Sequence, residues 1–255
     1  MSRNLKDFFF KQAKRHGFLA RSAFKLTEIQ ERFRVIRAGG SVLDLGCCPG
    51  AWIQVALQAI TAQRASTKPS SLILGVDLKT CRLPQALEGR QQIQLLEADA
   101  RHLQAVQLLQ HCRQGFHTVL SDMCPDTSGI AAADVARSLE LAGHAVRLAL
   151  SNSSELPDGI RVTPPDQSAS LSDAHETSPE GPQPGGVLLP EGHLVVKVLS
   201  GSGCNELHDY LRHHFRKVVW AQPKASRSES REMYLVGLCR QLTNSAGART
   251  RVVPK

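Results

Sequence analysis

A glycine-rich turn after a short apolar run is the first feature of this sequence that could bind a ligand. Residues 42–52 read Val-Leu-Asp-Leu-Gly-Cys-Cys-Pro-Gly-Ala-Trp. Its glycines have G-x-x-x-G spacing, whereas a backbone that closes on a pyrophosphate uses G-x-G-x-x-G, so a nicotinamide or flavin dinucleotide is disfavoured. We expect Gly46 and Gly50 to let the backbone approach a ligand without a phosphate, and Trp52 to form an aromatic wall beside it.

Acidic residues stand at the ends of three apolar runs that follow this turn. Asp77 closes Leu-Ile-Leu-Gly-Val, Asp99 lies just beyond residues 95–97, and Asp122 follows Thr-Val-Leu-Ser. A carboxylate after the second strand of a nucleotide-binding sheet accepts both ribose hydroxyls, and we assign this role to Asp77. Asp99 is placed to accept from an adenine amino group. A lone aspartate more often caps a turn or a helix, but three in this order favour a nucleoside cofactor.

The elements that must position these residues alternate along the chain. Short apolar or period-2 runs predict seven strands, at residues 41–45, 72–77, 93–97, 118–121, 193–199, 217–220 and 233–239. Helical patterns occur at residues 21–33, 52–59, 103–112, 132–150 and 205–215. This alternation predicts an α/β fold with a mostly parallel sheet covered by helices on both faces. We expect one domain over residues 1–255, which opens with a basic helical segment at 1–40 and ends with a basic tail at 241–255.

One stretch departs from this alternation of strands and helices, and the rest of the chain is more basic than the total charge indicates. Residues 151–186 hold six of the thirteen prolines and many Ser, Asp and Glu residues, so we expect a disordered insertion. With six acids and one arginine, the stretch carries −5 of a net charge of +8, which leaves +13 for the rest of the chain. This basic balance favours nucleic acid over a membrane surface as the partner. The longest apolar runs are too short to span a membrane, and we expect a soluble monomer.

Five sequence blocks, in chain order, resemble the signature motifs of the FtsJ-like ribosomal RNA large-subunit 2′-O-methyltransferases. They are Ser-Ala-Phe-Lys-Leu at 22–26, Leu-Asp-Leu-Gly-Cys-Cys-Pro-Gly-Ala-Trp at 43–52, Ser-Asp-Met-Cys-Pro at 121–125, Val-Val-Lys-Val at 195–198 and Ser-Arg-Glu-Met-Tyr at 230–234. Within the family, the chain is most similar to organellar, particularly plant-type, members. The resemblance implies a Rossmann-like methyltransferase fold that uses S-adenosyl-L-methionine. It also implies 2′-O-methylation of a ribose, of uridine, in large-subunit ribosomal RNA or an assembling large ribosomal subunit.

The same resemblance implies roles for individual residues. The family's lysine, aspartate, lysine, glutamate tetrad corresponds to Lys25, Asp122, Lys197 and Glu232. Its cofactor contacts correspond to Gly50, Trp52, Asp77, Asp99 and Asp122. The chain departs from the family at Cys47 and Cys48, where small alanines are usual, and at Asp126, where asparagine is frequent. The cysteines are small enough to fit, whereas Asp126 changes the local hydrogen bonding and bears on RNA placement.

Methyl transfer to ribose needs such a tetrad because a ribose hydroxyl is a poor nucleophile near neutral pH. An amine accepts the hydroxyl proton only when it is neutral. Burial and a second ammonium favour that state, whereas neighbouring carboxylates oppose it, so the sequence leaves the balance open. Lys197 is the predicted proton acceptor and Lys25 its ammonium neighbour, while Asp122 and Glu232 orient the amines and the hydroxyl. Positioning and proton transfer suffice for this chemistry, so we expect no metal.

Basic residues flank two members of the tetrad, and we expect them to hold RNA phosphates without reading sequence. They are Arg3, Lys6, Lys11, Lys14, Arg15 and Arg21 before the first block, and Lys224, Arg227 and Arg231 before Glu232. The seven cysteines include no C-x-x-C pair, which indicates reduced thiols in an intracellular compartment. The basic opening of the chain is also compatible with a mitochondrial or other organellar presequence.

Two alternative functions remain open at the level of the sequence. One is the same reaction on a transfer RNA or an mRNA cap, which an extra RNA-binding module would favour. The other is a catalytically silent RNA-binding or ribosome-assembly protein, which the loss of a tetrad member would favour. All four residues of the tetrad are present, and the sequence shows no pattern that predicts an extra RNA-binding module.

Overall fold

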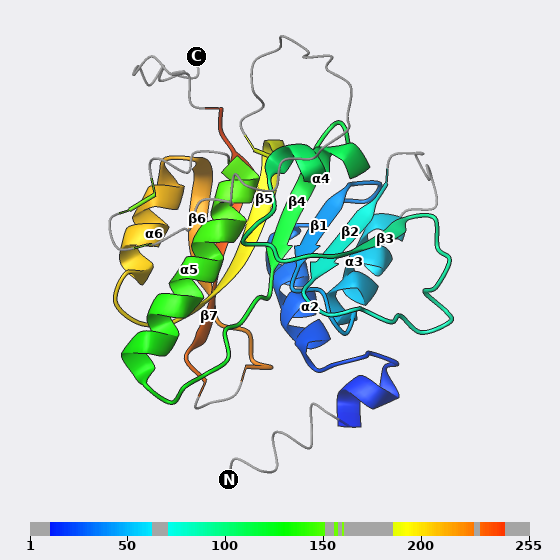
Figure 1. Ribbon diagram of the computed structural model, residues 1–255. Coiled ribbons are helices and arrows are strands. Elements are labelled where there is room, and N and C mark those ends of the chain that lie inside the picture. The colour runs from blue at the N-terminus through cyan, green and yellow to red at the C-terminus, as the bar shows by residue number, and fades with distance from the viewer. Residues whose placement is uncertain are drawn as a thin grey trace.

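A seven-stranded sheet forms the centre of the molecule (Figure 1). The structure is a computed structural model, which describes residues 11–62, 71–150, 156–157, 160, 186–226 and 230–242. The strands are β1 Val42–Leu45, β2 Ile73–Asp77, β3 Ile93–Glu97, β4 Phe116–Ser121, β5 Leu188–Leu199, β6 Phe215–Ala221 and β7 Glu232–Arg240. Their order is β3-β2-β1-β4-β5-β7-β6, with β7 antiparallel to both of its neighbours and the other pairs parallel. The predicted mostly parallel α/β sheet of seven strands is confirmed.

Helices cover both faces of the sheet, because successive side chains of a strand point to opposite sides. The helices are α2 Ser22–Phe33, α3 Ala51–Thr61, α4 Ala105–His111, α5 Ala131–Leu150 and α6 Cys204–Arg212. Leu43 and Leu45 of β1 belong to a core shared with α4, α5 and α6, whereas Val42 belongs to a second core with α2 and α3. Two buried layers therefore hold the strand ends rigidly in place.

The segment that leads into α2 is fastened to α3 through one side chain, Gln54. Its oxygen accepts from the backbone N–H of Leu19 at 2.8 Å, and its amide nitrogen donates to the carbonyl of Gly17 at 2.9 Å. Helix α2 itself buries Ala23, Leu26 and Ile29 against the sheet. These contacts position Lys25, which lies on the same helix.

The largest differences between observed and predicted element boundaries are at the start of β5 and at the end of α6. Strand β5 begins at Leu188 and not at residue 193, although Pro190 and Glu191, with a φ of 59°, interrupt its regular pairing. Such residues signal a turn in a sequence, but here they form an irregular strand beside β4. Phe215 was predicted as the last residue of a helix, but it is the first residue of β6 and is buried there.

Parts of three predicted segments lie outside the described residues. These are most of 151–186, residues 243–255 of the predicted tail, and the positions of Arg3, Lys6 and Arg227. Within 151–186, Ile160 is buried and Leu156 packs against the same core as α5. Ile160 and Leu156 therefore pack in the core that contains α5, although the stretch around them was predicted to be a disordered insertion. Among the described helices, none is long and apolar enough to cross a membrane.

Candidate active site

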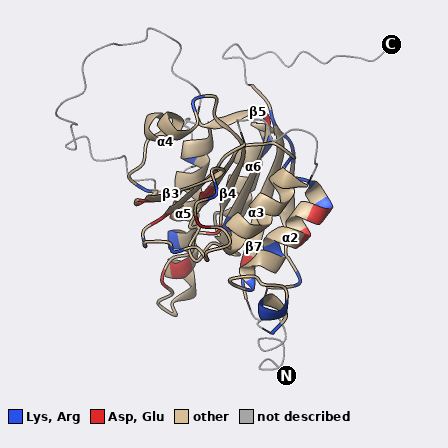
Figure 2. Cartoon of the chain, turned by 90° about the vertical axis from the view of Figure 1, so that its right-hand side faces the viewer, with Lys and Arg blue, Asp and Glu red and all other residues tan. Residues whose placement is uncertain are grey.

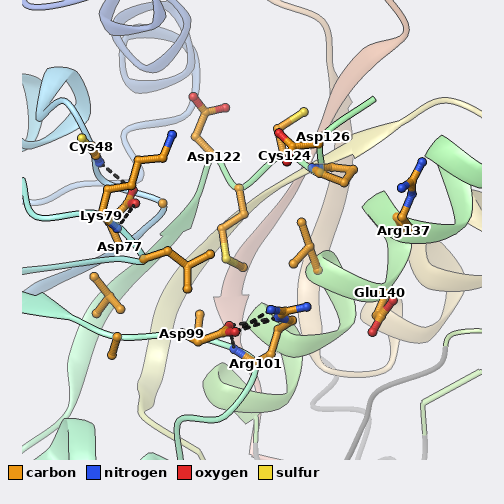
Figure 3. Close-up of a pocket in the computed structure, with 18 of the residues that line it drawn as sticks. Cys48, Asp77, Lys79, Asp99, Arg101, Asp122, Cys124, Asp126, Arg137 and Glu140 are labelled. Atoms are coloured by element: carbon orange, nitrogen blue, oxygen red, sulfur yellow. Dashed lines mark hydrogen bonds and ion pairs between the residues drawn. The ribbon is translucent and has the colours of Figure 1, made fainter. Parts of the chain in front are cut away.

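A cavity of about 750 Å³ lies at the carboxyl ends of the parallel strands. Its wall includes Gly46 directly after β1, Asp77 at the end of β2, Asp99 beyond β3 and Asp122 directly after β4. Figure 3 shows the three aspartates around the same space, with residues of α5 on the side opposite Asp77. In a doubly wound sheet, ligands bind at this edge. The fold thus brings together residues that are far apart in the sequence.

The two glycines of the turn have different surroundings. Gly46 lines the cavity with a φ of 79°, and a Cβ there would meet the backbone nitrogen of Met123 at 3.0 Å. Gly50 precedes α3 with a φ of 100°, and a Cβ there would meet Leu83 at 2.4 Å. Gly50 is not among the residues that line the cavity. Its lack of a side chain makes room for Leu83, so the predicted approach of its backbone to a ligand is not seen.

Trp52 is placed differently from the predicted aromatic wall. The residue is 2% exposed and packs in the core between α2 and α3, outside the cavity lining. Its indole N–H donates to the carbonyl of Ser22 at 2.9 Å, and its ring lies 5.8 Å from that of Tyr234. A large aromatic ring stabilises the core when it is buried, and its hydrogen bond fixes the start of α2. In this structure, Trp52 contacts the start of α2 and Tyr234 and does not line the cavity.

Asp77 is oriented by two backbone N–H groups. Cys48 donates to one carboxylate oxygen at 2.9 Å and Lys79 donates to the other at 3.0 Å. A carboxylate has about four lone-pair positions, two on each oxygen. These two hydrogen bonds use one position on each oxygen, so one further acceptor position remains on each. Two free acceptors side by side match the pair of hydroxyls of a ribose.

Asp99 is held by the guanidinium of Arg101, which also lines the cavity. The shortest of these contacts, from Nη2 to Oδ2, is 2.6 Å. The side-chain hydrogen bond from Arg101 lowers the pKa of Asp99, while partial burial opposes that effect. The carboxylate is therefore charged near neutral pH and is suited to accept hydrogen bonds.

The predicted tetrad forms two lysine–carboxylate pairs. Lys25 Nζ of α2 lies 2.7 Å from Glu232 Oε2, at the start of β7. Lys197 Nζ of β5 lies 2.9 Å from Asp122 Oδ1 and also donates to the backbone carbonyl of Asp122. Both lysines are buried, at 4% and 5% exposure. A buried ammonium is stable only when it is paired, so these positions require their carboxylates.

Tyr234 joins the two pairs and was not identified from the sequence. Its hydroxyl donates to Asp122 Oδ1 at 2.8 Å, and its ring centroid lies 6.0 Å from Lys25 Nζ. Burial, followed by the charge of Asp122, raises the pKa of this tyrosine well above its ordinary value, so it remains a donor. The signal in the sequence was the period-2 spacing from Glu232, which puts both side chains on one face of β7.

Charges around Glu232 keep it ionised. Burial acts to raise its pKa, but the charge and hydrogen bond of Lys25, with the charge of Lys197, outweigh burial and lower it below the ordinary value. Both lysines therefore lie within electrostatic reach of the same carboxylate. The arrangement can hold a hydroxyl, accept its proton and balance the charge that results.

The departures from the family pattern lie at the edge of the cavity. Cys48 and Asp126 line it, whereas Cys47 is buried beneath the turn. The sulfur of Cys47 would lie 2.9 Å from a Cβ built on Gly75, so that glycine leaves the room that the thiol needs. Among the described residues, no group of three His, Cys, Asp or Glu side chains could hold a metal ion.

Comparisons with known proteins show the family to which the chain belongs. A family model for FtsJ-like methyltransferases matches residues 18–240. A protein named ribosomal RNA large subunit methyltransferase E from Syntrophobacter fumaroxidans is 32% identical over 240 residues, which are 93% of this chain and 98% of the relative. One of the same name from Methylobacillus flagellatus is 32% identical over 243 residues and 94% of each chain.

A solved structure shares the fold. It is described as a ribosomal RNA methyltransferase from Plasmodium falciparum, and it matches with a TM-score of 0.60 at 20% sequence identity. The match covers 88% of this chain and 98% of that one. Since the family model spans most of the chain and the relatives match it almost from end to end, this protein is a member of the FtsJ-like methyltransferase family.

Proposed function

We propose that the protein transfers a methyl group from S-adenosyl-L-methionine to the 2′-hydroxyl of a ribose in large-subunit ribosomal RNA, with uridine as the acceptor nucleoside. The observation that carries this proposal is the pair of lysine–carboxylate contacts, Lys25 with Glu232 and Lys197 with Asp122, beside a cavity lined by strand-end aspartates. The two bacterial relatives are named as ribosomal RNA large subunit methyltransferases, which supports this choice of RNA.

The donor set of the cavity fits this cofactor. Asp77 would hold the ribose hydroxyls, Asp99 would accept from the adenine amino group, and Gly46 would lie against the methionine portion. Leu78 is 62% exposed although it lines the cavity, and burying an apolar side chain against a base is favourable. When bound, S-adenosylmethionine supplies a methyl group activated by a sulfonium.

The tetrad would act on the hydroxyl of the acceptor. Lys197, in its neutral form, would accept the proton of the 2′-hydroxyl, while the cofactor would supply the methyl group and leave as the thioether. Asp122, fixed by Lys197 and Tyr234, keeps the amine in place. Lys25 and Glu232 orient the hydroxyl from the opposite side and provide a paired charge close to it. Such fixed groups act mainly by positioning and by stabilising charge.

Two basic stretches meet near the tetrad and would hold the RNA backbone. Lys11, Lys14 and Arg15 are exposed on the helical segment before α2, where the ribbon in Figure 2 carries the blue of lysine and arginine. Lys224 and Arg231 are exposed on the loop between β6 and β7. The backbone N–H of Lys224 donates to Glu28 of α2 at 2.7 Å, so this loop is tied to the helix that carries Lys25.

Binding and product mapping test the proposal separately. Calorimetry should detect S-adenosylmethionine binding to the wild-type protein and clearly weaker binding to Asp99→Ala. Equal affinities in the two proteins would remove Asp99 from the site. For the substrate, 2′-O-methylated positions should be mapped in ribosomal RNA from cells with and without the protein. Loss of a methyl mark on large-subunit RNA supports the proposal, whereas a change confined to transfer RNA or mRNA caps contradicts the choice of substrate.

A further inference from the structure

The nucleobase end of the cavity is occupied by a protein ion pair. Arg101 donates to Asp99 through its backbone N–H at 2.9 Å, through Nε at 3.0 Å to each oxygen, and through Nη2 at 2.6 Å. Each oxygen of Asp99 therefore accepts two contacts from Arg101. Since a carboxylate offers about four lone-pair positions, an incoming amino group must replace part of this pairing.

The side chain of Arg101 is half exposed, whereas its backbone is fixed. Arg147 of α5 donates to the carbonyls of Arg101 and Leu103 at 3.3 and 3.0 Å and anchors the loop. The guanidinium, by contrast, belongs to a side chain that is 46% exposed. The side chain of Asp99 is 19% exposed. Solvent-exposed ion pairs contribute little to stability, so opening this half-exposed pair costs less than opening a fully buried one.

A second carboxylate faces the same guanidinium. Glu140 of α5 lines the cavity, and in Figure 3 the guanidinium of Arg101 lies between Asp99 and Glu140. The hydrogen bond that Arg101 donates to Asp99 is the main cause of a raised pKa for Arg101, and the charges of Asp99 and Glu140 add to it. Apart from Asp99, Glu140 is therefore the carboxylate of the cavity whose charge acts on this guanidinium, and it is the partner to which the guanidinium can turn.

We propose that Arg101 is an exchangeable partner of Asp99 that sets the nucleobase preference of the cofactor site. An adenine amino group takes the acceptor positions of Asp99, and the guanidinium moves to Glu140. A 6-keto base has no amino group to offer Asp99, but it accepts from Arg101 while the guanidinium remains on Asp99. Arg101 thus competes with adenine and tolerates the keto base. The inference rests on the proposed function, since it takes this cavity as the S-adenosylmethionine site.

Two ligands that differ at one group test the exchange. S-adenosyl-L-homocysteine carries the amino group, and S-inosyl-L-homocysteine carries a keto oxygen in its place. Titration calorimetry with Arg101→Ala should show adenosyl binding that is roughly 1.5- to 5-fold tighter than in the wild type, the size expected for an exposed ion pair. Inosyl binding should weaken, because the keto oxygen then faces a bare carboxylate. Glu140→Gln should weaken adenosyl binding, because the displaced guanidinium loses its second partner.

A matched control removes the same kind of pair elsewhere. Arg216 contacts both oxygens of Glu191 at 2.9 and 3.0 Å, with both side chains at least 60% exposed. Arg216→Ala should change neither affinity, and thermal unfolding should show that every variant is folded. Unchanged affinities in Arg101→Ala, or a parallel loss for both ligands, overturn the exchange while the cofactor site stands. A wild-type protein that binds neither S-adenosylmethionine nor S-adenosylhomocysteine overturns the proposed function, and the exchange with it.

Discussion

At the scale of single residues, the proposed chemistry depends on how Lys197 is held. Its ammonium contacts Asp122 through both a carboxylate oxygen and the backbone carbonyl, and Tyr234 donates to the same carboxylate oxygen. The amine is thus fixed by acceptors at the end of a buried strand. A group held this way can act as a base or as a fixed charge, and a single substitution separates the two roles.

Lys197→Arg keeps the positive charge and much of the length, but a guanidinium stays protonated at any usable pH. If Lys197 is the proton acceptor, single-turnover methyl transfer to unmodified large-subunit ribosomal RNA should fall roughly 100- to 10,000-fold. Cofactor and RNA affinities should change little. Lys217→Arg, on the exposed part of β6, is the matched control. Near-normal rates for Lys197→Arg would leave this residue with an electrostatic or positioning role.

A buried ionisable group, Asp44 in β1, affects stability and its pH dependence. The residue is fully buried, and among the described residues neither oxygen has a hydrogen-bond partner. Burial is the main cause of a pKa well above the ordinary aspartate value of 3.8, and the charges of Asp122 and Asp77 add to it. The unfolded chain therefore ionises at a lower pH than the folded protein, so stability falls as the pH rises above that value.

Asp44→Asn removes this ionisation while keeping the shape of the side chain. The variant should gain stability relative to the wild type as the pH rises from about 4 to about 7, by up to about 1.4 kcal/mol per pH unit for a single group. Urea unfolding at several pH values measures the difference. A stability difference that stays constant over this range would show that Asp44 ionises normally in the folded protein.

Sequence motifs predicted the positions of the aspartates better than the surroundings of the aromatic residues. Asp77 and Asp122 follow apolar strands directly, and the strand ends of a parallel sheet share one edge, so local pattern determines their place. Trp52 is the second residue of α3, where a large ring can face either the ligand or the core. Its burial depends on contacts with α2 and Tyr234, which come from distant parts of the chain.

At the scale of elements, the connection between α5 and β5 contains residues that pack in the core near both of its ends. Ile160 and Leu156 pack in the core, and Val187 is buried directly before β5. Gly186 has a φ of 70°, and a Cβ there would overlap the backbone of Ala149. A residue with a side chain does not fit at this point. The sequence predicted an insertion from its composition, but three scattered apolar residues carry no periodic signal that would predict packing.

Replacing residues 162–184 with a short Gly/Ser linker should therefore leave the melting temperature and methyl transfer nearly unchanged. This stretch is rich in Pro, Ser and acids, and such composition buries little apolar surface. Thermal unfolding and a turnover assay measure the two effects. Ile160→Ser is the matched comparison, because it should lower stability by exposing a core position to a polar group. A collapse of stability in the linker variant would show that the replaced stretch packs on the domain.

At the scale of the whole molecule, the charge distribution favours RNA at the end of the sheet that carries the tetrad. The basic segment precedes α2, and the loop between β6 and β7 is tied to α2 by the hydrogen bond from Lys224 to Glu28, so both stretches adjoin the helix that carries Lys25. The net charge of +8 predicted a polyanionic partner, but only the fold brings the two basic stretches together. Charge attraction to phosphates of this kind depends strongly on salt.

The double variant Lys11→Ala/Lys14→Ala should bind ribosomal RNA more weakly and with a shallower dependence on salt. Removing one lysine–phosphate interaction reduces the slope of log affinity against log salt by about 0.7 to 0.9. Affinity for S-adenosylmethionine should remain the same. The comparison variant Arg212→Ala/Lys217→Ala removes an equal charge from α6 and β6. An equal loss of RNA affinity in both variants would indicate non-specific attraction by net charge.

The antiparallel pairing of β5 with β7 makes turnover a report on the quality of folding. Lys197 lies opposite Tyr234, and Leu199 lies opposite Glu232. A shift of one residue between these strands turns every side chain to the other face, whereas the cavity lining extends only from Gly46 to Leu141 and leaves both strands out. A refolded or heat-stressed sample can therefore recover its circular dichroism and its ligand binding and still fail to methylate. For this protein, methyl-transfer activity therefore measures the fraction of molecules in which β5 and β7 are paired in the native register.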